Sequence, residues 1–502
     1  MLSIEEVKKH FKEYEFSQKY LDILNYIREN PNAHISIQGN AGAGKSSLLK
    51  IIRYMFSDDI SNENLNVVIA SSTGVASALL NSGNNIGATT IHSLFKLKPL
   101  NIYGNFEKNK AMNKTVISEI DVLIIDEISM VSSDLFDYIM DYIKVCRGGK
   151  PTRIILFGDC LQLQCVVKDE DDVSEYYKNR YNGRHEFFSA YAFTREKFVT
   201  FLLTKIYRQN GDDKFIEILN RIRVGEQTQK DLDFINTRVV NEEEYIIKNE
   251  SFLRIVSTNK DVDKYNKISL DMIDGNYIKL KAEITGSFRE SQEFKNGHFA
   301  EEVYVKIGCT VMILQNGGKN EDGTYDYYNG NIGILTKIEN GICYIDLGDK
   351  VVNVPRSTTN TYEYTVDEEG HVDAKISGSY TNNMIRPCSA STIFKCQGLT
   401  INQGYVDFGW WIPPNGIYVA LSRFRNMNDF ALSHPIKMKD ITVAQESLNY
   451  VKKAENEEGS VFFDDDAYKS KADIIKEFLT KNNIGFINGK FIDKNTDEEI
   501  II

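Results

Sequence analysis

Four segments in the first third of the chain have the pattern of buried strands. HISIQ alternates apolar and polar residues, whereas the other three contain continuous apolar runs, which are typical of strands covered on both faces of a parallel sheet. The segments are HISIQ (34–38), NVVIASS (66–72), VLIIDE (122–127) and RIILFGD (153–159). SSLLKIIRYM (46–55) carries its apolar residues at helical spacing. Alternation of this kind predicts a parallel α/β domain over residues 30–160.

A different pattern fills residues 270–385. Short apolar runs such as TVMIL, IGILTKI and CYIDL are separated by Asn-Gly pairs that begin at positions 296, 316, 329 and 340. Asn-Gly between apolar runs is the strongest short signal for a β-hairpin. We therefore expect a small antiparallel β-barrel, SH3-like in form, inserted into the α/β part of the chain.

Composition narrows the class of protein. The chain has 502 residues, of which 42% are hydrophobic and 26% charged, with a net charge of −12. We expect an intracellular protein, because no apolar run reaches the roughly 18 residues that span a bilayer, the N-terminus is highly charged and the seven cysteines form no CxxC pair. The expected location is the cytoplasm of a bacterial or phage-infected cell, or the nucleus or mitochondrion of a eukaryote. Net negative charge argues weakly against nucleic acid, but a basic groove can lie on an acidic body.

GNAGAGKSS (39–47) matches the phosphate-binding pattern G-x-x-x-x-G-K-[ST]. Average composition predicts only about 0.02 such matches by chance in a chain of this length. Small residues let backbone N–H groups surround phosphate oxygens at a helix N-terminus. Lys45 is expected to neutralise the β- and γ-phosphates of ATP, and Ser46 to hold Mg²⁺. The residues expected to contact nucleotide here are Gly39, Asn40, Ala41, Gly42, Ala43, Gly44, Lys45, Ser46 and Ser47.

Polar groups follow two of the predicted strands. The strand at 122–127 ends in Asp126 and Glu127, and the strand at 153–159 leads into Gln162. Parallel sheets bind ligands at the carboxyl ends of their strands. We expect Asp126 to hold Mg²⁺, Glu127 to orient the attacking water and Gln162 to sense the γ-phosphate. In isolation Asp126 could be a helix cap, and Gln162 a polar turn residue.

Further motifs follow in a characteristic order along the chain. They are SSTGVASALL (71–80), TTIHSLF (89–95), DEISM (126–130), GDCLQL (158–163), IYRQNGDDKF (206–215), STIFKCQGLT (391–400) and YVALSR (418–423). To about residue 435 this series resembles superfamily 1 DNA helicases of the 5′-to-3′ branch, in particular the petite-integration-frequency (PIF) family, to which Dda and RecD are related.

The resemblance implies two RecA-like parallel-sheet domains with ATP between them and single-stranded DNA across both. Gln18 of FSQKY would read the adenine. Arg208 and Arg423 would reach the phosphates from the second domain, where the planar guanidinium stabilises the charge of the transferring group. For an isolated arginine, an ion pair on the surface is the alternative. The expected catalytic residues are Lys45, Glu127, Gln162, Arg208 and Arg423.

The resemblance also implies DNA contacts that grip phosphates without reading sequence. The matching positions are Ser72, Thr73, Thr90, His92 and Ser93 in the first domain, and Thr392, Phe394 and Lys395 in the second. A buried core histidine is the alternative for His92. Phe394 stands where the family usually has histidine, and offers a stacking face instead of a hydrogen bond. Gln164 and Cys165 replace the family's two prolines, which predicts a less rigid loop.

The expected domains are a first RecA-like domain (1–198), a second one (199–269 and 386–450), the inserted β-barrel (270–385) and an extension (451–502). Within the first domain, residues 96–115 suggest a short hairpin, either a plain surface feature or a pin whose Tyr103 or Phe106 meets the first base pair. The charge-rich run at 168–180 is interpreted as a solvated loop, and Trp410 and Trp411 as core residues. In the extension, residues 471–482 suggest a helix and residues 486–493 a tight hairpin.

The motifs predict ATP hydrolysis, and the resemblance implies an ATP-dependent 5′-to-3′ DNA helicase that acts, as a monomer, on single-stranded and forked DNA. Replication or recombination proteins are candidate partners, and no membrane partner is expected. Two alternatives remain: an ATP-gated nucleic-acid clamp that does not unwind, and a motor directed to RNA, because the side chains reveal no reader of the 2′-hydroxyl.

Overall fold

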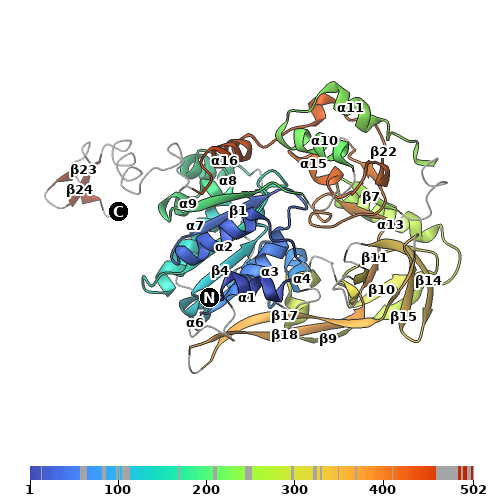
Figure 1. The fold of residues 1–502 in the computed structure, drawn as a ribbon, viewed down its shortest axis with the longest axis horizontal. Coiled ribbons are helices and arrows are strands. Elements are labelled where there is room, and N and C mark those ends of the chain that lie inside the picture. The colour runs from blue at the N-terminus through green and yellow to red at the C-terminus, as the bar shows by residue number, and fades with distance from the viewer. Residues whose placement is uncertain are drawn as a thin grey trace.

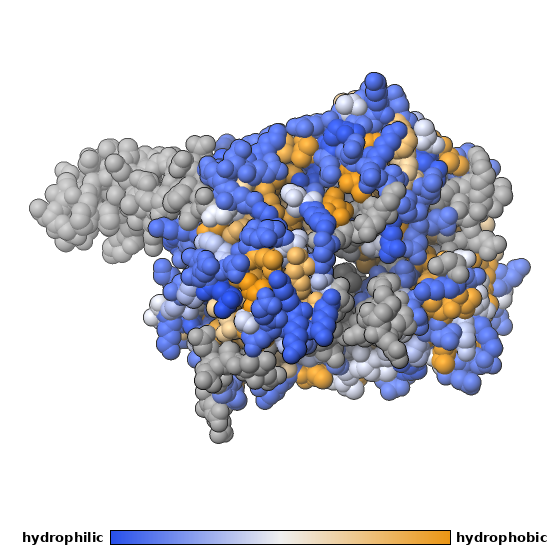
Figure 2. Space-filling model, viewed as in Figure 1, coloured by the Kyte–Doolittle hydropathy of each residue, from blue (hydrophilic) through white to orange (hydrophobic). Residues whose placement is uncertain are grey.

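The computed structural model describes most of the chain (Figure 1). It leaves out residues 13, 57–64, 82–85, 98–99, 101, 105–112, 168–169, 207–211, 244–251, 296–298, 320–324, 328, 330, 349, 368–369, 410, 460–483, 488–489, 494–498 and 501–502. Two α/β lobes and an inserted β region make up the body of the molecule. Hydrophilic residues cover most of the face seen in Figure 2, with apolar residues in scattered groups. Among the described helices, none combines the length and apolar character needed to cross a membrane.

The first lobe is built on a six-stranded parallel sheet of order β3-β2-β4-β5-β1-β6. Its strands are β1 (Ile35–Gly39), β2 (Val67–Ser71), β3 (Thr89–Thr90), β4 (Val122–Asp126), β5 (Arg153–Gly158) and β6 (Val199–Leu203). Its helices are α1 (Ile4–His10), α2 (Gln18–Glu29), α3 (Lys45–Met55), α4 (Gly74–Asn81), α5 (Ile91–Leu94), α6 (Lys114–Glu119), α7 (Ser133–Cys146), α8 (Asp171–Tyr181) and α9 (Tyr191–Arg195), with 3₁₀ turns η1 (Ile128–Met130) and η2 (Phe187–Ser189). All four strands expected from the apolar pattern are present.

Both faces of this sheet are buried, as the continuous apolar runs require. Alternate residues of β4 enter different clusters: Ile124 packs with α1, α2 and α3, whereas Leu123 and Ile125 pack with α6, α7 and α9. This is the two-residue periodicity of a strand. The sheet therefore holds β1, β4 and β5 rigidly, with their carboxyl ends at one edge.

The second lobe has a four-stranded parallel sheet of order β20-β7-β21-β22. Its strands are β7 (Leu253–Val256), β20 (Ala390–Thr392), β21 (Gly404–Asp407) and β22 (Phe430–Leu432). Around it lie α10 (Asp213–Val224), α11 (Gln229–Asn236), α13 (Asn259–Asp271), α15 (Gly416–Leu421), η4 (Met427–Asp429) and η5 (Met438–Asp440). The core of this lobe also contacts Ala41 and Leu163 of the first lobe, so the two lobes pack directly against each other.

The inserted region is antiparallel, as expected, and its SH3-like form stays a prediction. A five-stranded sheet of order β16-β15-β14-β11-β19 forms its centre. Its elements are β8 (Ile278–Lys281), β9 (Glu283–Gly286), η3 (Ser287–Glu290), α14 (Gln292–Lys295), β10 (Glu302–Val305), β11 (Thr310–Ile313), β12 (Gly317–Lys319), β13 (Tyr325–Tyr327), β14 (Ile332–Glu339), β15 (Ile342–Asp346), β16 (Val351–Val354), β17 (Arg356–Val366), β18 (Val372–Asn383) and β19 (Ile385–Pro387). Asn340 and Gly341, both with positive φ, form the two-residue turn between β14 and β15.

The hairpin formed by β17 and β18 was not predicted. It runs from the inserted region beneath the first lobe (Figure 1). The side chain of Asn66, just before β2, donates to the carbonyl of Gly370 and accepts from the N–H of Val372. The hydroxyl of the buried Tyr364 accepts from the N–H of Ile69 at 3.1 Å. The inserted region is thus fastened to both lobes.

The domain boundary expected at residue 198 is wrong, because β6 pairs with β1 in the first sheet. The expected end of the second lobe at residue 450 is wrong too. Helix α16 (Gln445–Asn456) packs on the first lobe, where the ring of Tyr450 stacks on that of Phe188 at 4.3 Å. The chain therefore begins in the first lobe, builds the second and returns to the first.

Beyond α16, the hairpin expected at 486–493 is present as β23 (Ile484–Ile487) and β24 (Lys490–Asp493). Strand β25 (Glu499–Ile500) pairs with β24. The helix expected at 471–482 lies outside the described residues.

Two smaller expectations are also wrong. The charge-rich run at 168–180 contains α8, whose Val173, Tyr177 and Tyr181 recur every four residues and are buried. The acidic and basic side chains lie on the other face of an amphipathic helix. Trp411 is 44% exposed and is not a core residue, while Trp410 lies outside the described residues.

Candidate nucleotide cleft and nucleic-acid surface

The phosphate-binding loop lies between β1 and α3, in the predicted setting. Gly42 and Gly44 have φ of 77° and 81°, a backbone conformation that residues with a Cβ rarely adopt. Lys45 is the first residue of α3, and its Nζ donates to the carbonyl oxygens of Gly39 at 2.7 Å and Asn40 at 3.1 Å. The ammonium group is therefore held over the loop where phosphate oxygens would enter.

The carboxyl end of β4 places two acids beside this loop. Asp126 is buried, and this burial, together with the neighbouring Glu127 carboxylate, raises its pKa to about 7. Glu127 has a left-handed backbone (φ 51°), a strained conformation for a side-chain-bearing residue. Its carboxylate accepts from Nε2 of Gln397, a second-lobe residue, at 3.3 Å. The two lobes thus meet at the acid expected to orient water.

Gln162 lies in the loop after β5. Its Nε2 donates to Oδ2 of Asp159 at 2.9 Å, and both side chains are buried. Burial opposes ionisation of Asp159, but the Arg223 guanidinium and Lys45 outweigh it and lower the pKa of this carboxyl. Arg223 comes from α10 in the second lobe, so a buried ion pair also joins the lobes here.

The second-lobe wall of the cleft is α15 and the residues after it. Arg423 is 1% exposed; its guanidinium donates to the carbonyl of Val419 and the hydroxyl of Ser422, both at 2.8 Å. Burial lowers the pKa of Arg423. The Tyr418 hydroxyl accepts from the N–H of Ala41, within the phosphate-binding loop, at 3.2 Å. Arg423 is thus brought to the cleft, whereas Arg208 lies outside the described residues.

Gln18 begins α2 at the rim of the cleft. It is exposed, and its Nε2 donates to Oδ1 of Asp22 at 2.8 Å. Two residues on, the hydroxyl of Tyr20 donates to the carbonyl of Gly44 at 2.8 Å. Helix α2 is therefore tied to the phosphate-binding loop, and the contact of Gln18 with a base stays a prediction.

The first-lobe residues expected at DNA lie at strand ends on the same edge of the sheet. The hydroxyl of Ser72 donates to the carbonyl of Glu127 at 2.8 Å, which links this group to the cleft. Thr73 and Thr90 cap α4 and α5: their hydroxyls accept from the N–H of Ala76 and Ser93, respectively.

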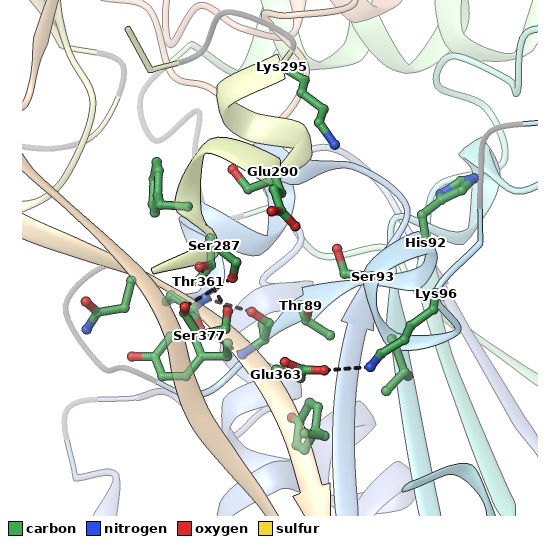
Figure 3. Close-up of a pocket in the computed structure, with 18 of the residues that line it drawn as sticks. Thr89, His92, Ser93, Lys96, Ser287, Glu290, Lys295, Thr361, Glu363 and Ser377 are labelled. Atoms are coloured by element: carbon green, nitrogen blue, oxygen red, sulfur yellow. Dashed lines mark hydrogen bonds and ion pairs between the residues drawn. The ribbon is translucent and has the colours of Figure 1, made fainter. Parts of the chain in front are cut away.

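His92 and Ser93 line a pocket of about 410 Å³ between the first lobe and the inserted region (Figure 3). In Figure 3, α5 and Lys96 lie on one side, and Glu290 and Lys295 on the other. Nε2 of His92 and the Tyr103 hydroxyl are 2.8 Å apart, and burial lowers the pKa of His92. His92 is thus hydrogen-bonded within the protein and also lines the pocket, and its contact with DNA stays a prediction.

Tyr103 does not lie at a hairpin tip. Its ring is 4% exposed and packs near Tyr138, and its backbone N–H donates to the Asp134 carboxylate. A base pair cannot stack on this ring in the present conformation, so that part of the expectation is corrected. Phe106 lies outside the described residues.

In the second lobe, the buried Thr392 hydroxyl accepts from the N–H of Lys395 at 3.3 Å. Lys395 is exposed, and Phe394 packs partly against the lobe core. The structure therefore presents the Lys395 ammonium at the surface, while only part of the Phe394 ring remains available to a base.

Sequence reasoning assigned no role to several residues that join these parts. Asp159, Gln397 and Tyr418 lie within the quoted motifs, so the motifs could have identified them as residues of the cleft. Gln164 was expected in a loose loop, yet its Nε2 donates to the carbonyl of Cys160 at 2.6 Å and to the hydroxyl of Ser447, in α16, at 2.8 Å. No sequence signal identified α16 as the partner of this loop.

Comparisons with known proteins agree with this geometry. Residues 16–171 match the family model described as "AAA domain". The chain is 26% identical over 427 residues to ATP-dependent DNA helicase Pif1 of Bdellovibrio bacteriovorus, covering 82% of this chain and 87% of that protein. It is 29% identical over 343 residues to PIF1 of Saccharomyces cerevisiae, covering 63% of this chain but only 36% of the yeast protein.

Solved structures of Pif1 from Bacteroides are also similar. The complex with ADP-AlF4 has a TM-score of 0.77 at 26% identity and covers 90% of this chain and 99% of the other. The complex with ADP-AlF3 and single-stranded DNA has a TM-score of 0.60 at 26% identity and covers 90% and 100%. Fold and cleft together define a P-loop enzyme with two RecA-like lobes. More particularly, the chain is similar to the Pif1 helicases, at 26–29% identity to the proteins and structures named above.

Proposed function

We propose that this ATP-dependent DNA helicase moves 5′ to 3′ along single-stranded DNA and separates the duplex ahead of it. The observation that carries the proposal is the meeting of both lobes at the phosphate-binding loop. Tyr418 contacts the backbone of Ala41, and Gln397 contacts Glu127. A ligand bound in this loop touches both lobes, so its hydrolysis can change their separation.

In this proposal the residues of the first lobe bind and orient the triphosphate. Lys45 neutralises the β- and γ-phosphates, and backbone N–H groups of residues 39–47 surround them. The Ser46 hydroxyl and the Asp126 carboxylate would hold Mg²⁺, because oxygen atoms are the ligands that this ion prefers. Mg²⁺ would neutralise phosphate charge when bound. Gln18 would hydrogen-bond the adenine.

Glu127 orients the water that attacks the γ-phosphorus, with ADP as the leaving group. Gln162 hydrogen-bonds the γ-phosphate, and Arg423, with Arg208, stabilises the charge that develops on its oxygens. The guanidinium of Arg423 donates to two neutral acceptors, the carbonyl of Val419 and the hydroxyl of Ser422. These two hydrogen bonds leave the positive charge of Arg423 available to a phosphate oxygen.

The DNA strand would lie across the strand ends of both lobes. Ser72, Thr73, Thr90, His92 and Ser93 would contact its backbone in the first lobe, and Thr392, Phe394 and Lys395 in the second. Hydroxyl and N–H groups suit this role because they bind phosphate in any sequence. The pocket beside His92 and Ser93 lies between this surface and the inserted region, which would border the DNA path.

We assign the duplex-separating pin to residues 96–115, with Phe106 as the contacting residue and Tyr103 as part of its buried base. Phe106→Ala should then reduce unwinding more than DNA-stimulated ATP hydrolysis. Equal loss of both activities would argue against a pin.

Three further expectations stay predictions: replication or recombination proteins as partners, action as a monomer, and the cellular compartment.

The direct test is a strand-separation assay on duplexes with either a 5′ or a 3′ single-stranded tail, with Lys45→Ala as the inactive control. The proposal predicts ATP-dependent separation of the 5′-tailed substrate alone. ATP hydrolysis without separation of either substrate would indicate a nucleic-acid clamp. Stimulation of hydrolysis by RNA rather than by DNA of the same sequence would indicate an RNA motor.

A further inference from the structure

We propose that Arg223 is a positioning residue for ATP hydrolysis, which links the γ-phosphate-sensing Gln162 to closure of the two lobes. The inference rests on the proposed function of this cleft. It concerns the part of α10 (Asp213–Val224) that follows the IYRQNGDDKF motif and for which the motifs indicated no role. Arg223 itself would not touch the nucleotide and acts through Asp159.

The contact is a buried ion pair between lobes. The guanidinium of Arg223 lies 3.0 Å from Oδ1 of Asp159, and the two side chains are 9% and 1% exposed. The other oxygen of the same carboxylate, Oδ2, accepts from Nε2 of Gln162 at 2.9 Å. One carboxylate therefore holds the sensing side chain of the first lobe and a cation of the second.

The face of α10 that carries Arg223 is turned toward the first lobe. Asn220 lies three residues earlier, on the same face of the helix, and its Oδ1 accepts from Nδ2 of Asn40 in the phosphate-binding loop at 3.3 Å. Helix α10 thus contacts both the phosphate-binding loop and the loop that contains Gln162. Movement of the second lobe away from the first must break both contacts.

Separation of the lobes pulls the two charges apart, so their mutual attraction in the closed cleft is lost and water must hydrate each of them again. The pair therefore favours the closed arrangement, in which Asp159 is fixed and orients Gln162. When the γ-phosphate leaves, Gln162 loses one of its proposed partners while it still shares the carboxylate with Arg223. The state of the phosphate is in this way transmitted to the helix that moves with the second lobe.

Arg221, two residues away on α10, provides a matched comparison. It forms an ion pair with Asp231 at 2.7 Å, but both residues belong to the second lobe and the arginine side chain is 37% exposed. A partly exposed pair within one lobe is screened by solvent and does not depend on lobe separation. Arg221→Gln therefore removes the same chemical group without removing the link between lobes.

The experiment measures steady-state ATP hydrolysis, with saturating single-stranded DNA, for Arg223→Gln, Arg223→Lys and Arg221→Gln. For Arg223→Gln we expect kcat to fall about tenfold or more while KM for ATP stays within about threefold, as expected for lost coupling between sites. Arg223→Lys, which keeps the charge, should recover part of the rate. Arg221→Gln should stay within about twofold of the parent chain.

Asp159→Asn and the double variant Asp159→Asn/Arg223→Gln extend the test if Arg223→Gln folds poorly. Because the pair acts as a unit, the double variant should be no slower than the slower single variant. Equal rates for Arg223→Gln and Arg221→Gln, or losses that simply multiply in the double variant, would overturn the inference. The parent chain separates the two proposals: if it unwinds DNA and these variants do not differ, only the role of Arg223 fails.

Discussion

The first lobe contacts the rest of the chain in two different ways, at the nucleotide cleft and at the docked β17–β18 hairpin. The cleft is joined by buried charged and polar side chains, such as the pair of Arg223 and Asp159. Among the described residues, the hairpin is joined by hydrogen bonds to backbone groups, by packing of Tyr364 in the first-lobe core and by the ion pair of Lys96 with Glu363, whose side chains are 50% and 47% exposed. Contacts in the cleft should therefore govern turnover, and contacts of the hairpin should affect mainly the position of the inserted region.

The largest expected effect is that of Lys45→Ala. Removal of the ammonium leaves the phosphates without their fixed cation, and DNA-stimulated ATP hydrolysis should fall by about a hundredfold or more. Circular dichroism should show an unchanged fold. Lys50→Ala, on the same helix but outside the loop, is the control, and full residual hydrolysis in Lys45→Ala would remove the assignment of the phosphate-binding loop.

Arg423→Ala should have the next largest effect. Nucleotide binding depends mainly on the first lobe and should be retained, whereas turnover should fall by about a hundredfold, as for loss of a group that stabilises transition-state charge. A fluorescent ATP analogue measures nucleotide binding, and the rate of phosphate release measures turnover. Turnover equal to that of the parent chain would mean that another group supplies this charge.

Helix α16 forms a third contact with the first lobe. We expect the effect of breaking this contact to lie between the effects of breaking the contacts in the cleft and those of the hairpin. The Tyr450 hydroxyl lies 3.1 Å from Oγ of Ser36 and 3.0 Å from Oγ1 of Thr200, all buried in the first lobe. Tyr450→Phe should lower the free energy of unfolding by about 1–2 kcal/mol, because buried hydroxyls lose a partner. Urea denaturation measures this change. Gln445→Ala, on the exposed face of α16, is the control, and the two variants should differ clearly in their midpoints.

The smallest expected effect is that of Glu363→Gln. An exposed ion pair contributes about 0–1 kcal/mol and is screened by salt, so stability and ATP hydrolysis should hardly change. Thermal unfolding at low and high salt measures the difference. A large loss of hydrolysis in this variant would contradict the distinction between the cleft and the hairpin.

The cleft could be predicted from the sequence because phosphate chemistry restricts both residue types and their spacing. A lysine after small residues and an acid pair after an apolar strand have few other uses. The partners across the cleft could not be predicted in the same way. Arg223 pairs with a residue 64 positions away, and Gln164 with one 283 positions away, and nothing in either local pattern encodes these distances.

The limits of local sequence patterns also explain why the structure differs from the expectations for α8, for Tyr103 and for the β17–β18 hairpin. In α8 the density of charge concealed an apolar stripe at four-residue spacing. The backbone of Tyr103 is held by Asp134, which lies 31 positions away on α7. The β17–β18 hairpin is rich in threonine and serine and shows no strict alternation, so its docking on the first lobe became visible only in three dimensions.

The central claim is that one triphosphate lies between two lobes and is contacted by both. A crystal structure of this chain with Mg²⁺ and ADP-aluminium fluoride tests it most directly. The account predicts Lys45 and Arg423 both within hydrogen-bonding distance of the fluoride that replaces the γ-phosphoryl group. Nucleotide bound elsewhere, or contacted by the first lobe alone with the lobes closed, would contradict it.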